Sequence, residues 1–191
     1  MFAVTTDQEE VGRIQGRQFA VFLKQGGSLL YIEGPSTGDV AQLRSLGMNS
    51  ARPENVNPKV LRGDWTEQSG YRAVKSWLSL STSQQLHIGV IGCQNDAMAL
   101  GARRAFDEVP DSQVRKDWLS LPFTGCDGVP KTGQEWVRRG LLVATVVVPP
   151  TMGLAFEIMA RAIRSGTPPP QRTLSNPSSY PTIEQLSAPK S

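Results

Sequence analysis

Histidine and cysteine are scarce in this sequence. The 191 residues include one histidine, His87, and two cysteines, Cys93 and Cys126. Structural zinc sites use four cysteine or histidine ligands, and most catalytic triads need a histidine beside the nucleophile. The two cysteines cannot form a metal site by themselves, so we expect no metal. We expect no cofactor either. For the cysteine pair, packing as small apolar side chains is the default expectation and a disulfide is the alternative.

Long apolar runs are absent too. No stretch approaches the ~18–20 apolar residues that a helix needs to span a bilayer. Residues 1–17 lack a basic start followed by an apolar stretch, so they do not form a secretory signal peptide. The hydrophobic content of 39% and the mean hydropathy of -0.27 instead indicate a soluble globular protein. Either the protein is cytosolic, or the sequence begins downstream of its true start.

Clusters of basic charge are missing as well. The net charge is +3 at pH 7, and the basic pairs lie scattered at positions 103–104, 115–116 and 138–139. A nucleic-acid surface needs lysine and arginine gathered on one face, so we expect no nucleic-acid partner. The segment 34–38 lacks the lysine of a phosphate-binding loop, and Pro35 removes an amide that would hold a phosphate.

Short apolar runs alternate with amphipathic segments along the chain. The apolar runs predict buried strands, and apolar residues spaced three and four positions apart predict helices. The predicted strands cover residues 28–34, 59–63, 87–92, 121–125 and 142–148. The predicted helices cover residues 7–26, 39–51, 66–80, 96–108, 131–140 and 152–164. Because strands that alternate with helices imply right-handed crossovers, we predict an α/β fold with a parallel sheet flanked by helices.

Polar residues follow several of the predicted strands. Ligands of open parallel sheets bind beyond the carboxyl ends of the strands. The loops at these ends are residues 34–39, 63–65, 92–96 and 125–128. Helix capping is one explanation for the Asp and Asn residues in these loops, and contact with a ligand is the other. Trp65 either packs over a helix end or offers a flat apolar platform beside the polar groups.

An aromatic face beside carboxylates, amides and an arginine suits a polyhydroxylated ligand. Sugar hydroxyls donate to carboxylates and accept from arginine, while the C–H face of the sugar ring stacks on an aromatic side chain. Buried polar groups of this kind discriminate between ligands, because a missing hydroxyl leaves them unpaired. Paired carboxylates for glycoside hydrolysis look alike in sequence, so an enzyme is kept as a lesser alternative.

Two segments resemble a known family. They are residues 94–102 (QNDAMALGA) and residues 125–130 (GCDGVP), the second of which is followed by residues 140–146 (GLLVATV). Weaker matches occur at residues 6–16, 44–48 and 63–71. In this order, the set resembles the type I periplasmic binding proteins, and the ribose-binding proteins in particular. The resemblance implies a Rossmann-like lobe that binds a sugar or polyol in the periplasm, serves the membrane component of an ABC transporter and catalyses nothing.

Carried over residue by residue, the resemblance also implies a ligand site. Its residues are Asp7, Arg44, Trp65, Asn95 and Asp127. Arg44 would otherwise be interpreted as a solvated helix residue, but the resemblance turns it inward as a donor to several hydroxyls. One departure from the family is Val148, which stands where a polar residue, often glutamine, is usual.

Members of this family carry most of a first lobe before the segment that matches the start of this chain. The resemblance therefore divides the chain into a second lobe (3–146), a remnant of the first lobe (147–174) and an extended tail (175–191) that returns to the second lobe. The apolar face of the predicted helix 152–164 then has no sheet of its own to cover. We expect weak or absent sugar binding, and either self-association through Met152, Phe156, Met159 and Ile163 or an unusual docking of this helix.

The main alternative is the effector-binding domain of a lactose-repressor-type transcription regulator, which shares this fold. That class carries a helix-turn-helix segment at its N-terminus, ahead of the part of the family that this sequence resembles, so the lack of one here discriminates weakly. Residues 128–140 are more similar to the transport proteins. Solute binding is therefore the leading prediction.

Overall fold

The computed structural model describes residues 1–81, 83 and 86–188, and its main feature is a six-stranded sheet in the order β3-β2-β4-β5-β6-β8. The strands of this sheet are β2 (Gly27–Glu33), β3 (Val56–Arg62), β4 (Ile88–Cys93), β5 (Phe123–Asp127), β6 (Ala144–Val147) and β8 (Ser178–Tyr180). Neighbouring strands pair in parallel except β8, which runs antiparallel to β6. The predicted α/β fold with a parallel sheet is confirmed, and the strand bounds differ from the predicted ones by a few residues.

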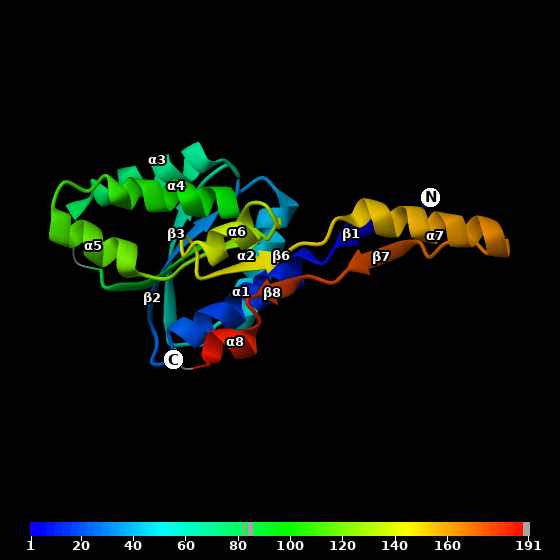
Figure 1. Cartoon of the computed structure of the whole chain (residues 1–191), viewed down its shortest axis with the longest axis horizontal. Helices are drawn as coiled ribbons and strands as arrows, with labels where there is room; N and C mark the ends of the chain where they lie inside the picture. The colour runs from blue at the N-terminus through cyan, green and yellow to red at the C-terminus, as the bar shows by residue number, and fades with distance from the viewer. Residues whose placement is uncertain (82, 84–85, 189–191) are drawn as a thin grey trace.

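Helices cover both faces of this sheet (Figure 1). The helices of the six-stranded sheet are α1 (Gln8–Phe22), α2 (Asp39–Ala51), α3 (Glu67–Leu78), α4 (Asp96–Asp107), α5 (Ser112–Ser120), α6 (Gly133–Arg138) and α8 (Ile183–Ser187), and α7 (Thr151–Ser165) lies away from it (Figure 1). The helix α1 packs against α2, and α3 packs against α4. Among the described residues, we find no helix with the length and apolar character that crossing a membrane requires.

The strand β2 shows how one apolar run serves both layers of helices. Leu29 and Tyr31 belong to the apolar cluster beneath α1 and α2. Leu30 and Ile32 belong to the cluster beneath α3 and α4. Successive side chains of a strand point to opposite faces, so a strand covered on both sides must be apolar throughout. This explains why the segment reads as a continuous apolar run.

A smaller unit projects from one end of the molecule (Figure 1). In this unit β1 (Ala3–Thr6) pairs in parallel with β7 (Arg172–Ser175), and α7 packs against β1. None of the residues of α7 is buried. The predicted division places β1 in the second lobe, residues 3–146. In the structure β1 pairs with β7, which begins in the predicted remnant of the first lobe (147–174) and ends in the predicted tail. The division of the chain into two lobes and a tail stays a prediction.

The end of the chain lies against the six-stranded sheet. The strand β8 pairs with β6, and α8 packs against α1. Neither element is predicted from the sequence, and neither is α5, whose Trp118 ring stacks on that of Phe106 with 4.7 Å between the ring centroids. Residues 189–191 of the predicted tail lie outside the described residues.

The two cysteines face opposite sides of the sheet. Gly92 pairs with Thr124 in the register of β4 and β5, so Cys126 lies one residue beyond the level of Cys93. Cys93 therefore joins the cluster beneath α3 and α4, and Cys126 joins the one beneath α1. Both thiols are buried and free, and burial raises the pKa of each. Packing as small apolar side chains is confirmed, and the disulfide alternative is wrong.

Candidate ligand-binding site

Four of the five predicted site residues meet at the carboxyl edge of the six-stranded sheet. A depression of about 260 Å³, which we call the rim depression, is lined by Val40, Arg44, Trp65, Asn95 and Asp127. Trp65 and Asn95 follow β3 and β4, and Asp127 ends β5, while the other two residues belong to α2. The carboxyl ends of parallel strands lie at the same edge of a sheet, which is why loops far apart in the sequence converge here.

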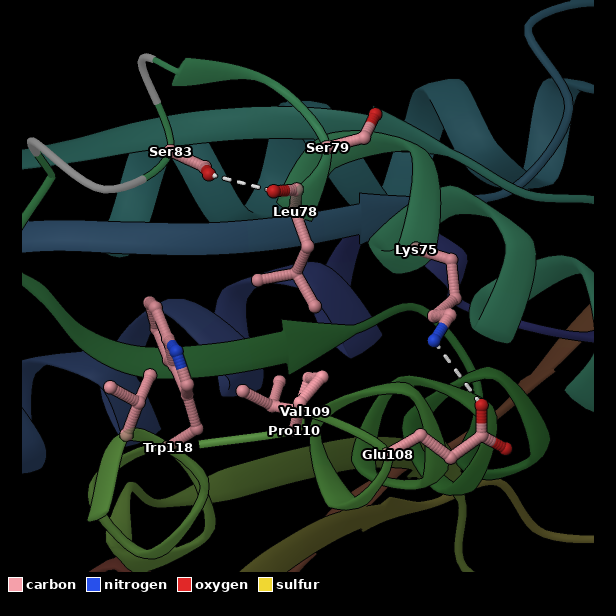
Figure 2. Close-up of a pocket in the computed structure, with 9 residues that line it drawn as sticks. Lys75, Leu78, Ser79, Ser83, Glu108, Val109, Pro110 and Trp118 are labelled. Atoms are coloured by element: carbon pink, nitrogen blue, oxygen red, sulfur yellow. Dashed lines mark hydrogen bonds and ion pairs between the residues drawn. The ribbon is translucent and has the colours of Figure 1, made fainter. Parts of the chain in front are cut away.

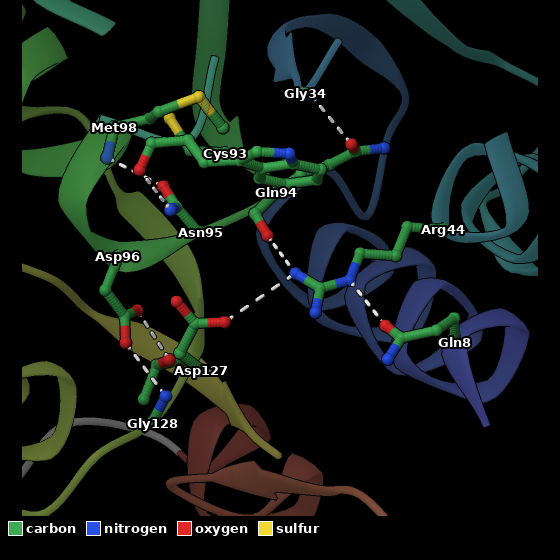
Figure 3. A network of polar contacts seen from close by, with 12 residues as sticks. Gln8, Gly34, Arg44, Cys93, Gln94, Asn95, Asp96, Met98, Asp127 and Gly128 are labelled. Carbon is green, nitrogen blue, oxygen red and sulfur yellow. Dashed lines mark hydrogen bonds and ion pairs between the residues drawn. The ribbon is translucent and has the colours of Figure 1, made fainter. Parts of the chain in front are cut away.

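Arg44 is fixed inside the protein, and only 5% of it is exposed. Its Nη1 donates a hydrogen bond to the backbone oxygen of Gln94, and its Nε donates to Gln8 Oε1 at 2.9 Å (Figure 3). The guanidinium carbon lies 5.6 Å from the centroid of the Trp65 ring, within the range of a cation–π interaction. No described residue accepts a hydrogen bond from Nη2, so this group is available to a ligand.

Asp127 faces Arg44 across the rim depression. Its Oδ1 lies 3.8 Å from Arg44 Nη1, which is too long for a direct hydrogen bond. Burial raises the pKa of Asp127, and the guanidinium of Arg44 opposes this shift. The side chain remains 42% exposed. The carboxyl oxygens can therefore accept hydrogen bonds from a ligand that enters between the two side chains.

The backbone is left-handed at two positions of the rim depression. The φ angles of Trp65 and Asp127 are 70° and 104°. Residues other than glycine rarely adopt such angles, which cost about 1–3 kcal/mol each and persist only where the surroundings enforce them. Asn95 Nδ2 donates to the backbone oxygen of Trp65 at 2.7 Å, and Val148 N donates to that of Asp127 at 3.0 Å. Strained residues of this kind gather at ligand sites, which supports a functional role for this edge.

The indole ring of Trp65 lies directly against the backbone of Gly34. A Cβ at Gly34 would overlap the ring, so only glycine leaves room for the indole in this position. Gly34 N in turn donates to Gln94 Oε1 at 2.9 Å, which secures the loop below the ring. The structure thus combines the two interpretations of Trp65, since the ring packs against a strand-end loop and also lines the rim depression.

Asn95 and Asp7 both serve as helix caps. Asn95 Oδ1 accepts a hydrogen bond from Met98 N at 2.8 Å, and its amide group is used by Trp65. Asp7 Oδ1 accepts one from Glu10 N at 2.9 Å, and the Asp7 side chain is not among those that line the rim depression. The structure therefore brings Asp7 next to the site without placing it in the site, and Gln8 makes the contact with Arg44 instead.

Three polar residues of this edge escape the sequence prediction of site residues. Gln8 and Gln94 hold Arg44, and Gln94 also donates to the backbone oxygen of Ala41 at 3.0 Å. Asp96 is buried, and its carboxyl group accepts a hydrogen bond from the backbone N–H of Gly128, the residue that follows Asp127. Gln94 and Asp96 flank Asn95 directly after a buried strand, and this position is the signal that marks them.

Residues 34–38 have the Gly-x-Ser-x-Gly spacing of a hydrolase nucleophile elbow. Ser36 follows β2 at the carboxyl edge of the sheet, whereas His87, the sole histidine of the sequence, precedes β4 at the opposite edge. A serine nucleophile needs an adjacent base. This serine has no histidine within reach, so the geometry does not support a hydrolase.

A larger cavity of about 740 Å³ lies between the ends of α3, α4 and α5 (Figure 2). Leu78 and Trp118 contribute apolar walls, and Lys75 Nζ pairs with a carboxyl oxygen of Glu108 at 3.3 Å on one side. None of the polar residues that follow β3, β4 and β5 lines it. The rim depression is therefore the better candidate for a ligand rich in hydroxyl groups.

Comparison with known proteins places the chain in a family. Residues 1–167 match the family described as "Periplasmic binding protein domain". The chain belongs to this family. It is 28% identical over 145 residues to the xylitol-binding protein of Mycolicibacterium smegmatis, a match that covers 74% of this chain and 38% of that protein. It is 25% identical over 156 residues to the galactofuranose-binding protein YtfQ of Escherichia coli, covering 80% and 48% respectively. The chain thus spans less than half the length of these curated relatives.

Solved structures share the fold over nearly the whole chain. An ABC transporter periplasmic solute-binding protein of Actinobacillus succinogenes with bound D-allose has a TM-score of 0.78 at 21% identity, covering 97% of this chain and 62% of that chain. A solute-binding protein of Bacillus halodurans with bound myo-inositol has a TM-score of 0.76 at 18% identity, covering 96% and 61%. Similarity at these identities shows the fold alone. The predicted lobe of a periplasmic binding protein is confirmed.

Proposed function

We propose that this chain takes part in binding a sugar or polyol at the rim depression. The observation that carries the proposal is the meeting of a fixed guanidinium, a half-exposed carboxylate and an indole ring at one edge of the sheet. Arg44 would donate to ligand oxygens, and Asp127 would accept from ligand hydroxyls. The Trp65 ring would stack against the apolar face of the ligand.

The ligands named for the relatives support this chemical class. The two curated relatives are named for xylitol and galactofuranose, and the two structures described above hold D-allose and myo-inositol. Each of these molecules carries several neighbouring hydroxyl groups on a small carbon frame. The proposal is therefore for a class of small polyhydroxylated compounds and not for one member of it.

In this proposal the chain binds and releases its ligand and catalyses no reaction. Its place would be the periplasm, and its partner would be the membrane component of an ABC importer. The family description and the solute-binding structures support this assignment. They favour it over the alternative of an effector-binding domain of a transcription regulator, because the relatives described above are solute-binding proteins.

The rim depression is small for a ligand site. Its volume of about 260 Å³ lies just below the ~300–1,000 Å³ typical of pockets that enclose small molecules. A ligand seated there would contact the protein mainly on one side and would keep much of its surface in water. We therefore expect the 191-residue chain to bind a sugar weakly, with a Kd of about 1 mM, because few contacts offset the entropy cost of association.

A titration followed by NMR tests the proposal at such affinities. Xylitol, D-allose and myo-inositol would be added separately to the isotope-labelled chain. The indole N–H signal of Trp65 and the side-chain N–H signals of Arg44 should shift with ligand concentration. The indole signal of Trp118, which lines the other cavity, should stay in place.

Two matched substitutions sharpen this titration. Asp127→Asn should weaken binding by about tenfold, because the charged acceptor of a ligand hydroxyl is lost. Asp117→Asn makes the same change at an exposed carboxylate on α5 and should have no effect. Equal affinities for the two variants would show that Asp127 takes no part. If none of the three polyols moved the Trp65 or Arg44 signals, the proposed function would be wrong.

The exposed apolar face of α7 supports a second proposal. The exposed fractions of Met152, Phe156, Met159 and Ile163 are 70%, 63%, 41% and 77%. Their spacing of four, three and four residues places them on one face of the helix. Single exposed apolar side chains are common, but four in one stripe mark an interaction surface. We infer that copies of the 191-residue chain associate through this face.

A further inference from the structure

The carboxyl group of Asp96 is buried beneath the rim depression and joins separate parts of the chain. Asp96 is the first residue of α4, and only 3% of it is exposed. One carboxyl oxygen accepts a hydrogen bond from the Thr145 hydroxyl on β6 at 2.6 Å. The other accepts one from Gly128 N at 2.8 Å. Hydrogen bonds to a charged acceptor are among the strongest in proteins, so this group fixes its partners firmly.

Two glycines make room for this carboxyl group. A Cβ on Gly125 or on Gly133 would come within 3.0 Å of a carboxyl oxygen of Asp96, closer than Cβ atoms are found in proteins. Gly125 lies on β5 and Gly133 begins α6, so both elements close around the group. The carboxyl is thus enclosed by backbone, which cannot adjust as a flexible side chain would.

The turn that Asp96 holds carries Asp127. Asp127 and Gly128 are both left-handed, with φ angles of 104° and 58°. Gln134 Nε2 donates to the backbone oxygen of Gly128 at 2.7 Å, and Val148 N donates to that of Asp127 at 3.0 Å. Asp96 bonds the N–H group of the peptide that directly follows Asp127. Asp96 therefore fixes the peptide group between Asp127 and Gly128, and with it the direction in which the Asp127 side chain points.

We propose that Asp96 is a positioning residue for ligand binding, whose carboxyl group, bonded to Gly128 and Thr145, holds the turn that presents Asp127. The inference rests on the proposed function, in which Asp127 accepts a ligand hydroxyl. Asp96 does not itself line the rim depression. It acts on the ligand only through Asp127.

The protonation of Asp96 supplies a signal that can be followed together with ligand affinity, and a merely structural residue would leave the affinity unchanged. Burial raises the pKa of Asp96 to about 7, against the hydrogen bonds from Thr145 and Gly128, which lower it. The other charged and titratable groups that act near it are Asp127, which raises its pKa, Arg44, which lowers it, and the buried thiols of Cys93 and Cys126. The N-terminal end of the α4 dipole favours the charged form as well. The group should therefore change its charge near neutral pH.

Asparagine at this position imitates the neutral acid. Its oxygen would accept from Gly128 N, and its amide group would donate to the hydroxyl oxygen of Thr145. Asp96→Asn therefore keeps both bonds but removes the titration. Asp96→Ala removes both bonds and should release the turn.

The test combines xylitol affinity with the amide NMR signal of Gly128, each measured in the 191-residue chain from about pH 5 to about pH 9. In the unchanged protein we expect the signal and the affinity to titrate with a common midpoint near pH 7. Asp96→Asn should keep the affinity within about threefold and lose the midpoint, whereas Asp96→Ala should lose about tenfold or more. Thr145→Val removes a bond that stabilises the charged form, so it should move the midpoint to higher pH.

The outcomes separate this inference from the proposed function. A folded Asp96→Ala variant that binds xylitol as well as the unchanged protein would overturn the inference, and so would a Gly128 signal whose pH dependence is the same in Asp96→Asn as in the unchanged protein. If Asp96→Ala does not fold, the Asn and Thr145→Val variants decide through the same signal. If no polyol binds the unchanged protein, the proposed function fails. In that case a pH titration of the Gly128 signal that disappears in Asp96→Asn still supports the part of the inference in which Asp96 holds the turn at residues 127–128.

Discussion

Replacing Gly47 by alanine should weaken both the fold and the ligand site, because α1 and α2 touch there through their backbones. A Cβ on Gly47 would lie within 3.0 Å of the backbone oxygen of Glu9, and a Cβ on Gly12 would lie equally close to that of Arg44. The two glycines form one reciprocal contact between the helices. Because the atoms struck are backbone, no side-chain movement relieves the overlap, and α2 must shift away from α1.

Two opposing effects set the size of the loss. Alanine has a better helix propensity than glycine by about 1 kcal/mol. Inserting a methyl group into a packed interior costs about 1–3 kcal/mol, and contact with backbone places this substitution at or above the upper end. The net loss in the free energy of unfolding should be about 2 kcal/mol. For a chain of 191 residues, that loss corresponds to a fall in Tm of about 4–8 °C.

The shift of α2 should reach the ligand site as well. Arg44 lies one turn before Gly47 on α2, and its Nε donates to Gln8 Oε1 on α1 at 2.9 Å. Moving the helices apart lengthens this bond and turns the guanidinium away from Asp127. Urea unfolding followed by tryptophan fluorescence measures the stability change as a shift of the midpoint at constant slope. The Nε–H NMR signal of Arg44 reports on the bond to Gln8.

Gly153→Ala is the matched control for Gly47→Ala. Gly153 is also helical, but a Cβ there would meet nothing within 4 Å. The same substitution should therefore raise the free energy of unfolding by up to about 1 kcal/mol and leave the Arg44 signal unchanged. If Gly47→Ala unfolded at the midpoint of the unchanged protein and left the Arg44 signal in place, the reasoning from backbone contact would be refuted.

Two further predictions concern pH and self-association. Burial raises the pKa of Asp96 from 3.8 to about 7, so between those values the folded chain holds a proton that the unfolded chain has released. The free energy of unfolding should fall by up to about 4 kcal/mol as pH rises through this interval and stay level above it, a slope that Asp96→Asn should remove in urea titrations at several pH values. For α7, light scattering should show that the unchanged chain self-associates and that the Phe156→Glu variant does not. The control Leu46→Glu changes an exposed apolar residue of α2 and should self-associate as the unchanged chain does. A monomeric unchanged chain would contradict this.

The strands and longer helices are predictable because their signals are local. The segment 39–51 has the same bounds in the prediction and in the structure, and β2 differs from its predicted strand by one residue at each end. The helix α5 is short and its signal is weak, because it offers only the cap Asp111 and two apolar residues four positions apart, Val114 and Trp118, and none of its residues is fully buried. The strand β1 is missed for another reason, since it pairs with β7, and the hydroxyls of Thr6 and Ser175 meet across 169 positions of sequence.

The candidate site is predictable to the extent that it follows from the topology. Trp65, Asn95 and Asp127 follow parallel strands, so the rule for strand ends is enough to bring them to one edge. Arg44 comes from the family resemblance, because nothing in a helix of mixed polarity shows which way one arginine points. The role of Asp96 depends on partners 32 and 49 positions away. No local pattern in the sequence contains those contacts.

The polar groups of the rim depression are held in place by the fold itself. Gln94 and Gln8 fix the guanidinium of Arg44, and the backbone of Trp65 and Asp127 is kept in conformations that these residues would not adopt alone. Immobilising a flexible side chain on binding costs about 0.5–1.5 kcal/mol of free energy. In this site the side chains are already ordered when the chain folds, so ligand binding does not incur that cost. Weak binding by this chain would then reflect how few groups touch the ligand, and each contact added on its open side should raise the affinity with little loss to ordering.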